Sequence, residues 1–296
     1  MTDPLALLDG FDLPPVAVLG ASGRLGSMLR ACWPPGPVLW LTRRPLRARE
    51  GQLIAKYDPL GDPDHLSNVL YNSGAQAVLS LAGAVSNEAE DLAAHAALAE
   101  VLLDATDLPV LLASSAAVYG APSDDTPLRD DAPLLRGGAA SAYGRAKRAM
   151  EACAAGHPHA TVLRIGNVAG FDAALGGWRA GFQLDRFEDG SGPRRSYVGP
   201  GQLALMLAAL LSRAVEAPDA LPQALNVAAP GTVDMGALLD AAGRPYTHVA
   251  APPTAIPKVE LDVSTLLGLL PRDVADALKP ATAAGLVAEW RAVTQV

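Results

Sequence analysis

The stretch Val16–Gly26 reads VAVLGASGRLG and decides the fold. Its apolar start predicts a short buried strand, and glycines follow at once at positions 20, 23 and 26. Glycine permits a tight turn and a close approach of the backbone to a phosphate, and a helix that begins near Arg24 would turn its free N–H groups toward that anion. The stretch therefore favours a dinucleotide-binding loop over an ordinary strand-to-helix turn. The loop residues expected at the dinucleotide are Gly20, Ser22, Gly23, Arg24, Leu25 and Gly26.

Outward from this loop, short apolar runs alternate with longer segments of helical spacing. The predicted strands are Val16–Gly20, Val38–Leu41, Leu53–Tyr57, Ala77–Leu81, Val110–Ala113 and Thr161–Ile165. The predicted helices are Leu25–Cys32, Pro63–Tyr71, Glu88–Ala105 and Ser141–Ala154. Continuous apolar strands separated by helices indicate a parallel sheet that is covered on both faces. We therefore predict an α/β protein with a doubly wound parallel Rossmann sheet.

The alternation weakens after Gly166, where Gly and Arg become frequent, and a helix at Gly201–Glu216 and a strand at Ala224–Ala228 follow. We predict a nucleotide-binding Rossmann domain of residues 1–166 plus about 201–229. Residues 167–200 and 230–296 are expected to form a small C-terminal substrate-binding lobe. The Pro- and Asp-rich connection Gly120–Ala140 is too long for a simple turn, so we expect it to be functional or disordered.

Composition excludes several classes of protein. The chain has 296 residues, half of them hydrophobic, and its 31 acidic against 23 basic residues give a net charge of −8. That charge argues against a nucleic-acid partner, and no apolar run approaches the roughly 18 residues of a membrane span. The two cysteines fit neither a metal site nor a disulfide framework, and the N-terminus carries acids where a secretory signal needs positive charge. We expect a cytoplasmic protein without a metal site.

The second predicted strand continues as VLWLTRR and bears on the choice of dinucleotide. NAD needs an acidic side chain near this point to hold the ribose 2′-hydroxyl, but the chain has Thr42, Arg43 and Arg44 there. A guanidinium binds a 2′-phosphate that a carboxylate would repel, so NADP is predicted over NAD, unless both arginines are merely solvated. Asp58, after the third strand, fits either a contact to the adenine amino group or a turn before Pro59.

Two further segments carry candidate catalytic groups. The fifth strand ends in SSAAVYG, which places Ser115 at the edge where such sheets bind ligands. Tyr143 and Lys147 are four residues apart and would share one face of a helix. We expect the Lys147 ammonium to lower the pKa of Tyr143 and make the phenol an acid or base near neutral pH, with Ser115 orienting the substrate oxygen. Taken alone, such a Tyr and Lys spacing is frequently a surface pair.

Five motifs together, GASGRLG, SSAAVYG, YGRAK, LRIGNVAG and RRSYVGPGQLA, resemble the extended short-chain dehydrogenase/reductases, the epimerase/dehydratase type of Rossmann enzyme. The likeness runs from Val16 to about Trp290. It implies bound NAD(P), with Ser115, Tyr143 and Lys147 moving the proton and Lys147 also holding the nicotinamide ribose. It further implies cofactor contacts along Leu81, Ala82 and Gly83, and puts Asn167 and Val168 beside the nicotinamide and the substrate. Dimers are common in this family, which makes a homodimer an expectation.

The substrate side departs from the family pattern. Arg195 matches an arginine that often contacts a nucleotide-sugar diphosphate, but residues 199–202 (GPGQ) replace the usual His-Val-Asp-Asp. Ala116 and Ala117 replace the Asp-Glu pair of the sugar-nucleotide 4,6-dehydratases, so we predict that the chain is not such a dehydratase. His95 lies where relatives frequently have Asn, and we interpret it as structural.

Three functions fit these residues. The first is an NADP-dependent oxidoreductase that reduces a ketone or oxidises a secondary alcohol, with Tyr143 as acid/base. A nucleotide-linked small molecule is one candidate substrate. The second is a nucleotide-sugar epimerase that retains its NAD(P). The third is a non-catalytic NADP-binding regulator or assembly protein, against which the complete set of Ser115, Tyr143 and Lys147 argues. The sequence decides neither the substrate nor the choice between reduction and epimerisation.

Overall fold

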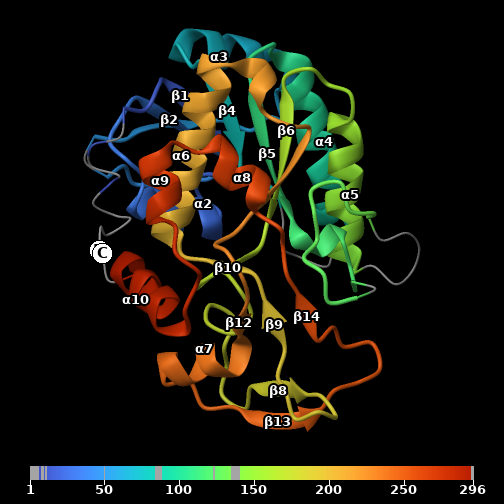
Figure 1. The fold of residues 1–296 in the computed structure, drawn as a ribbon. Coiled ribbons are helices and arrows are strands. Elements are labelled where there is room, and N and C mark those ends of the chain that lie inside the picture. Colours follow the sequence, from blue (N-terminus) through green and yellow to red (C-terminus); the bar gives the residue numbers. More distant parts are fainter. Residues whose placement is uncertain are drawn as a thin grey trace.

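The computed structural model describes residues 7, 10, 12–49, 51–83, 89–122, 124–134 and 141–294. It has an upper body built on one large sheet and a smaller lobe beneath it (Figure 1). In the described part of the chain, no helix has the length and apolar character needed to cross a membrane.

Seven parallel strands form the large sheet, in the spatial order β11-β6-β5-β4-β1-β2-β3. The order runs outward in both directions from β1 and β4, which is the doubly wound arrangement predicted from the sequence. The strands are β1 (Val16–Leu19), β2 (Val38–Thr42), β3 (Leu53–Lys56), β4 (Ala77–Ser80), β5 (Val110–Ser115), β6 (Ala160–Ile165) and β11 (Ala224–Val227).

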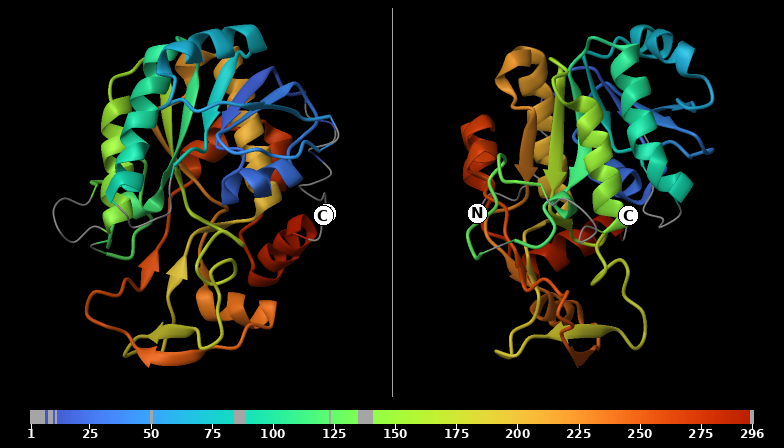
Figure 2. Two further views of the ribbon diagram at one scale, coloured as in Figure 1. Left: turned by 180° about the vertical axis from the view of Figure 1, so that it is seen from behind. Right: turned by 90° about the vertical axis from the view of Figure 1, so that its right-hand side faces the viewer.

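Helices cover both faces of the sheet because both faces are apolar. One face packs against α2 (Arg24–Ala31), α6 (Pro200–Glu216), α8 (Ser264–Leu269) and α9 (Arg272–Ala277). The other face packs against α3 (Leu66–Ser73), α4 (Ala89–Ala105) and α5 (Ala142–Ala154). The left view of Figure 2 shows the molecule from this side. Short 3₁₀ turns lie at η1 (Pro63–His65), η2 (Ala116–Val118) and η3 (Pro218–Ala220).

Helix α6 contains the longest apolar run of the chain, and its residues 203–211 are all buried. A helix that is apolar all round must be covered all round. The sheet covers one side of α6, and α2, η3 and α10 (Ala283–Thr294) pack against others.

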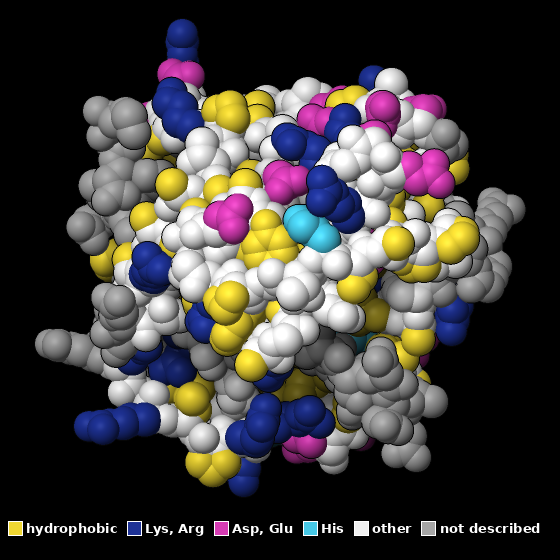
Figure 3. Space-filling model, turned by 90° about the horizontal axis from the view of Figure 1, so that it is seen from below, with side chains coloured by type: hydrophobic (Ala, Val, Ile, Leu, Met, Phe, Trp, Pro, Cys, Tyr) yellow, Lys and Arg dark blue, Asp and Glu magenta, His cyan; other side chains and the backbone are white. Residues whose placement is uncertain are grey.

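The lobe lies below the carboxyl ends of the sheet strands (Figure 1). It consists of a three-stranded sheet in the order β12-β9-β14, a β13-β8 pair and helix α7, with the β10-β7 pair where the lobe joins the body. Its elements are β7 (Asn167–Val168), β8 (Gln183–Arg186), β9 (Arg194–Arg195), β10 (Tyr197–Val198), β12 (Val233–Asp234), α7 (Met235–Ala242), β13 (Thr247–Ala250) and β14 (Lys258–Val259). Seen from this end, Lys and Arg side chains form several separate groups among hydrophobic and acidic ones (Figure 3).

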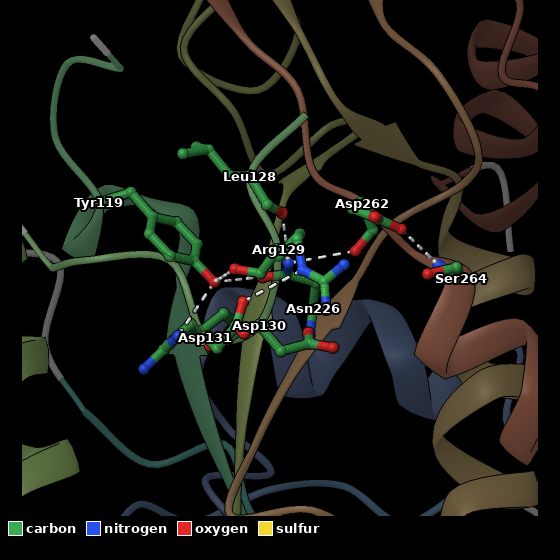
Figure 4. A network of polar contacts seen from close by, with 9 residues as sticks. Tyr119, Leu128, Arg129, Asp130, Asp131, Asn226, Asp262 and Ser264 are labelled. Carbon is green, nitrogen blue, oxygen red and sulfur yellow. Dashed lines mark hydrogen bonds and ion pairs between the residues drawn. The ribbon is translucent and has the colours of Figure 1, made fainter. Parts of the chain in front are cut away.

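Residues 124–134, which we call the strap, belong to the long connection singled out in the sequence. The strap carries no helix, but Leu128 forms an isolated parallel bridge with Leu261. The Leu128 N–H donates to the Glu260 carbonyl at 2.7 Å, and the Asp262 N–H donates to the Leu128 carbonyl at 2.8 Å. Polar side chains around Asn226 tie the strap to β11 (Figure 4). The described part of this connection is therefore ordered against the body.

Candidate active site

Two cavities open at the carboxyl ends of the central strands and meet at Leu81 and Gly83, which line both. The first, of about 260 Å³, we call the Tyr143 cavity; the second, of about 120 Å³, we call the Arg43 cavity. The predicted site residues in the Tyr143 cavity are Leu25, Leu81, Gly83, Ser115, Tyr143, Lys147, Asn167 and Val168. Those in the Arg43 cavity are Gly20, Ser22, Gly23, Arg43, Arg44, Leu81, Ala82 and Gly83.

Two glycines of the loop, Gly20 and Gly26, are packed too tightly to carry a side chain. A β-carbon at Gly20 would lie 2.8 Å from the backbone of Leu81 and Ala82, and one at Gly26 would lie 2.2 Å from the Gly20 carbonyl. Gly23 is the N-cap of α2, and no side chain caps that end of the helix. The first N–H groups of α2 therefore remain available to an anion in front of the loop.

The Arg43 cavity continues past the end of β2. Arg43 and Arg44 line it and are exposed, and no Asp or Glu is among its described lining residues. Tyr57 and Pro59 also line it, whereas Asp58 between them does not. Asp58 is exposed, and its carboxylate accepts a hydrogen bond from the Leu60 N–H at 3.3 Å, as in a turn.

Ser115 and Tyr143 reach the Tyr143 cavity from two elements. Ser115 is the last residue of β5, and its hydroxyl accepts a hydrogen bond from the Ala117 N–H at 3.2 Å. Tyr143 stands in the first turn of α5, which the Ser141 hydroxyl caps by accepting from the Gly144 N–H at 3.0 Å. Both side chains line the same cavity, and Ser115 acts on the pKa of Tyr143.

Lys147 lies one turn further along α5 and is almost fully buried. Its ammonium donates to the Ala113 carbonyl at 2.6 Å and lies 5.8 Å from the centre of the Tyr143 ring. Burial lowers the pKa of Lys147 to about 8, against the opposing effect of the Glu151 carboxylate. Glu151 is itself held by the Ser114 hydroxyl at 2.6 Å and by an ion pair with Arg164 at 2.8 Å.

The pKa of Tyr143 is raised above its ordinary value, contrary to the expectation from the sequence. Burial raises it, and the hydrogen bond with Ser115 only partly offsets that effect. Lys147 does not lower the Tyr143 pKa because its own pKa is only about 8, so the amine has lost its proton before the phenol ionises. In the protein without ligand, Tyr143 is therefore held as the neutral phenol, which is the form that can donate a proton.

The lobe side of the Tyr143 cavity contains residues that the sequence did not single out. Phe171 and Asp172 line it beside Asn167. The Asp172 carboxylate accepts from the Tyr197 hydroxyl at 2.8 Å and from three backbone N–H groups. Burial raises the pKa of Asp172 despite these hydrogen bonds. The motif LRIGNVAG indicated Asn167, but no local pattern pointed to Asp172, because its partner is 25 residues away.

Four predicted residues line neither cavity: Arg24, Gly26, Asp58 and Arg195. The Arg24 guanidinium stacks on the Phe171 ring, 5.0 Å from its centre, and thus links the glycine loop to the lobe. The Arg195 guanidinium donates to the carbonyls of Arg194, Ile256 and Pro257. Much of its donor capacity is therefore used inside the lobe.

Comparison with known proteins gives one family match. Residues 16–174 match the model of the NAD dependent epimerase/dehydratase family. A search of curated protein sequences found no match.

Solved structures with the same fold include three nucleotide-sugar or NAD enzymes. UDP-glucose-4-epimerase from Stenotrophomonas maltophila, with bound NAD and formylated UDP-arabinopyranose, has 17% identity, a TM-score of 0.76 and coverage of 95% of this chain and 98% of that one. The Bordetella bronchiseptica enzyme WbmG in complex with NAD has 18% identity, a TM-score of 0.69 and coverage of 97% and 95%. The dTDP-glucose 4,6-dehydratase of Bacillus anthracis in complex with NAD has 12% identity, a TM-score of 0.68 and coverage of 95% and 97%. At these identities the likeness establishes the fold.

Proposed function

The chain belongs to the NAD-dependent epimerase/dehydratase family of extended short-chain dehydrogenase/reductases, and from this we propose that it is an NAD(P)-dependent oxidoreductase acting on the carbonyl or secondary-alcohol carbon of a small molecule. The observation that carries the proposal is that Ser115, Tyr143 and Lys147 line one cavity, which continues into the cleft along the glycine loop. The backbone is closely packed around Gly20 and Gly26, so the loop has no side chains there. This fits a dinucleotide whose pyrophosphate lies against backbone N–H groups.

When bound, the nicotinamide supplies or accepts the hydride. The chain's own residues handle the proton and the geometry. In reduction, the Tyr143 phenol donates its proton to the carbonyl oxygen while the Ser115 hydroxyl hydrogen-bonds that oxygen and orients it. Lys147, with a pKa of about 8, holds a proton at neutral pH and can contact the ribose hydroxyls and stabilise the Tyr143 phenolate that remains. In oxidation, the same groups work in reverse, and Tyr143 takes the proton of the alcohol.

Replacing the acid tests this assignment. We expect Tyr143→Phe to lower turnover by at least about 100-fold, because the ring remains but no group donates the proton. Binding of NADPH, measured by fluorescence titration, should stay within about threefold of the wild type, since the ring packing is kept. Turnover near the wild-type rate in this variant would refute the assigned acid.

For the cofactor, we propose NADP rather than NAD. Arg43 and Arg44 support this because they line the Arg43 cavity, where a 2′-phosphate would lie. The solved structures compared above contain NAD, so the preference is a property to be tested on this chain.

The cofactor test compares two arginine variants. Arg43→Ala should weaken NADPH by about 10-fold or more and leave NADH almost unchanged, because only NADPH carries the 2′-phosphate. Arg47→Ala is the matched control, since Arg47 is exposed nearby but lines neither cavity. Equal losses for both cofactors in Arg43→Ala would show that no 2′-phosphate contact exists there.

A second candidate is epimerisation of a nucleotide-linked sugar with a retained cofactor. The Arg24–Phe171 contact favours it, because it joins the glycine loop to the lobe beside the cleft and would oppose release of the cofactor. Net consumption of NADPH with substrate separates the two, since reduction consumes it and epimerisation does not. We further propose that the chain is not a 4,6-dehydratase, because η2 presents Ala116 and Ala117 where that reaction needs carboxyl groups.

A further inference from the structure

His95 on α4 is only 2% exposed, yet it lines the Tyr143 cavity. Its ring lies directly against Gly83, where a β-carbon would lie 2.2 Å from the His95 Cε1 and 2.3 Å from Nδ1. A residue with a side chain at position 83 would therefore displace the imidazole. Gly83 lines both cavities, so the His95 ring supports the point at which they meet.

The same imidazole packs on the candidate acid. The ring centres of His95 and Tyr143 are 5.9 Å apart, and the ring planes make an angle of 78°. This is the edge-to-face geometry that aromatic rings prefer. Because His95 stands on α4 and Tyr143 on α5, the contact fixes the phenol relative to a second helix and not only to its own.

We propose that His95 is a positioning residue, whose ring holds the Tyr143 phenol in its orientation in the cavity that Ser115 also lines. Lys147 is a weaker candidate for this task because its ammonium is bonded to the Ala113 carbonyl. The proposal rests on the proposed function only for its effect on turnover. The packing of the phenol can be measured without substrate.

The pKa of Tyr143 reports this packing. Among the described residues that line the cavity, the charged and titratable groups beside Tyr143 are Lys147, His95 and Asp172, with Glu151 acting on Lys147, and only His95 is changed in the test. Burial raises the Tyr143 pKa, so removal of the covering ring should admit water and lower that pKa. A substitution that keeps a ring should leave the Tyr143 pKa nearly as it is.

The experiment is a phenolate absorbance titration, with each protein compared with the same protein carrying Tyr143→Phe, so that only the Tyr143 signal remains. We expect His95→Ala to increase the Tyr143 ionisation constant about tenfold and His95→Phe to change it by less than about threefold. Leu92→Ala, at a buried position one turn earlier on α4 that lines neither cavity, is the control for general loosening. An unchanged constant in His95→Ala would overturn the proposal, and so would a change in His95→Phe or in Leu92→Ala as large as the one in His95→Ala.

Turnover gives an independent measurement. His95→Ala should lower kcat by about 10- to 100-fold with the NADPH dissociation constant within about threefold, and His95→Phe should recover most of the loss. If kcat in His95→Ala equals that of Leu92→Ala, the positioning role is wrong. If the wild-type protein turns over no alcohol or carbonyl compound, the proposed function fails, while the titration still decides the packing of Tyr143.

Discussion

At the scale of single residues, the amine of Lys147 has the least ordinary environment in the site. It lies next to the β5 backbone with its ammonium bonded to a carbonyl, and its pKa falls from 10.5 to about 8. An amine with a lowered pKa prefers to be neutral in the folded protein. Between about pH 8 and pH 10.5 the unfolded chain therefore binds more protons at this position than the folded chain, and the free energy of unfolding rises with pH.

Lys147→Met should remove this rise. Between about pH 7 and pH 9.5, Lys147 should add roughly 2 kcal/mol to the free energy of unfolding, since one unit of pKa shift corresponds to about 1.4 kcal/mol. The check is urea unfolding of both proteins across this range, with the difference plotted against pH. Parallel curves would mean that the folded and unfolded chains hold the Lys147 proton equally well.

The sequence predicted which residues could form the candidate site, but it did not predict their pKa values or their hydrogen-bond partners. Local spacing places Tyr143 and Lys147 on one helix face, and the end of a parallel strand places Ser115 at the same edge of the sheet, where all three line one cavity. The raised pKa of Tyr143 and the carbonyl contacts of Arg195 depend on segments far away in the chain. Such effects follow from burial and tertiary packing, which no local pattern encodes.

At the scale of elements, the strap is held by a buried polar network centred on Asn226 of β11 (Figure 4). The Asn226 amide donates to the carbonyls of Leu128 and Asp262, at 2.8 and 3.1 Å, and its oxygen accepts from the Tyr119 hydroxyl at 2.8 Å. The Asn226 backbone N–H donates to the Asp130 carboxylate at 2.6 Å. One fully buried amide thus joins η2, the strap, β11 and the segment before α8.

Asn226→Ala should cost about 2–4 kcal/mol of stability, because it leaves two carbonyls and a hydroxyl without their buried partner. Asp262→Ala removes only an exposed carboxylate that accepts from the Ser264 N–H at 2.8 Å, and should cost no more than about 1 kcal/mol. Urea unfolding of both variants measures the contrast. Similar losses would mean that the network contributes no more than a surface cap.

Most elements of the body could be predicted, because strands buried on both faces read as continuous apolar runs. The ordering of the strap could not, because Leu128 and Leu261 are far apart in the sequence and pair through backbone groups that every residue carries. The same holds for the lobe, where β7, β9, β10, β12 and β14 have two residues each and show no periodicity.

At the scale of the whole molecule, α10 joins the two parts, since it packs against α7 of the lobe and against α6 and α2 of the body. The sequence suggested that residues 230–296 form the lobe. However, the hydrophobic core on the α6 face of the large sheet includes Leu261, Leu266 and Val274. We propose that residues 261–278 be counted with the Rossmann body. The boundary between the lobe and the body was hard to predict, because the sequence of a short helix that follows a proline does not show which surface the helix packs against.

The junction at α10 can be tested with two glycines of similar backbone geometry. Gly170 has φ +84° and Gly181 φ +80°, but a β-carbon at Gly170 would lie 2.1 Å from the Trp290 ring, whereas nothing lies within 4 Å at Gly181. Both substitutions to Ala should cost about 1 kcal/mol for the left-handed backbone, and Gly170→Ala about 2 kcal/mol more for the displaced ring. Thermal unfolding with tryptophan fluorescence measures both, and equal losses would show that Trp290 moves aside freely.

The Leu128–Leu261 bridge also bears on how the chain is made. During synthesis, the first six strands of the large sheet leave the ribosome well before residue 261 does, and domains begin to fold as their segments emerge. The Leu128 N–H must then wait for its partner, the Glu260 carbonyl, although the carbonyls of Arg129 and Asp130 already have partners in Tyr119 and Arg164. A nascent chain arrested before residue 260 should expose the peptide bonds at Leu128 to proteases that cannot cleave there once residues 260–262 have paired with it.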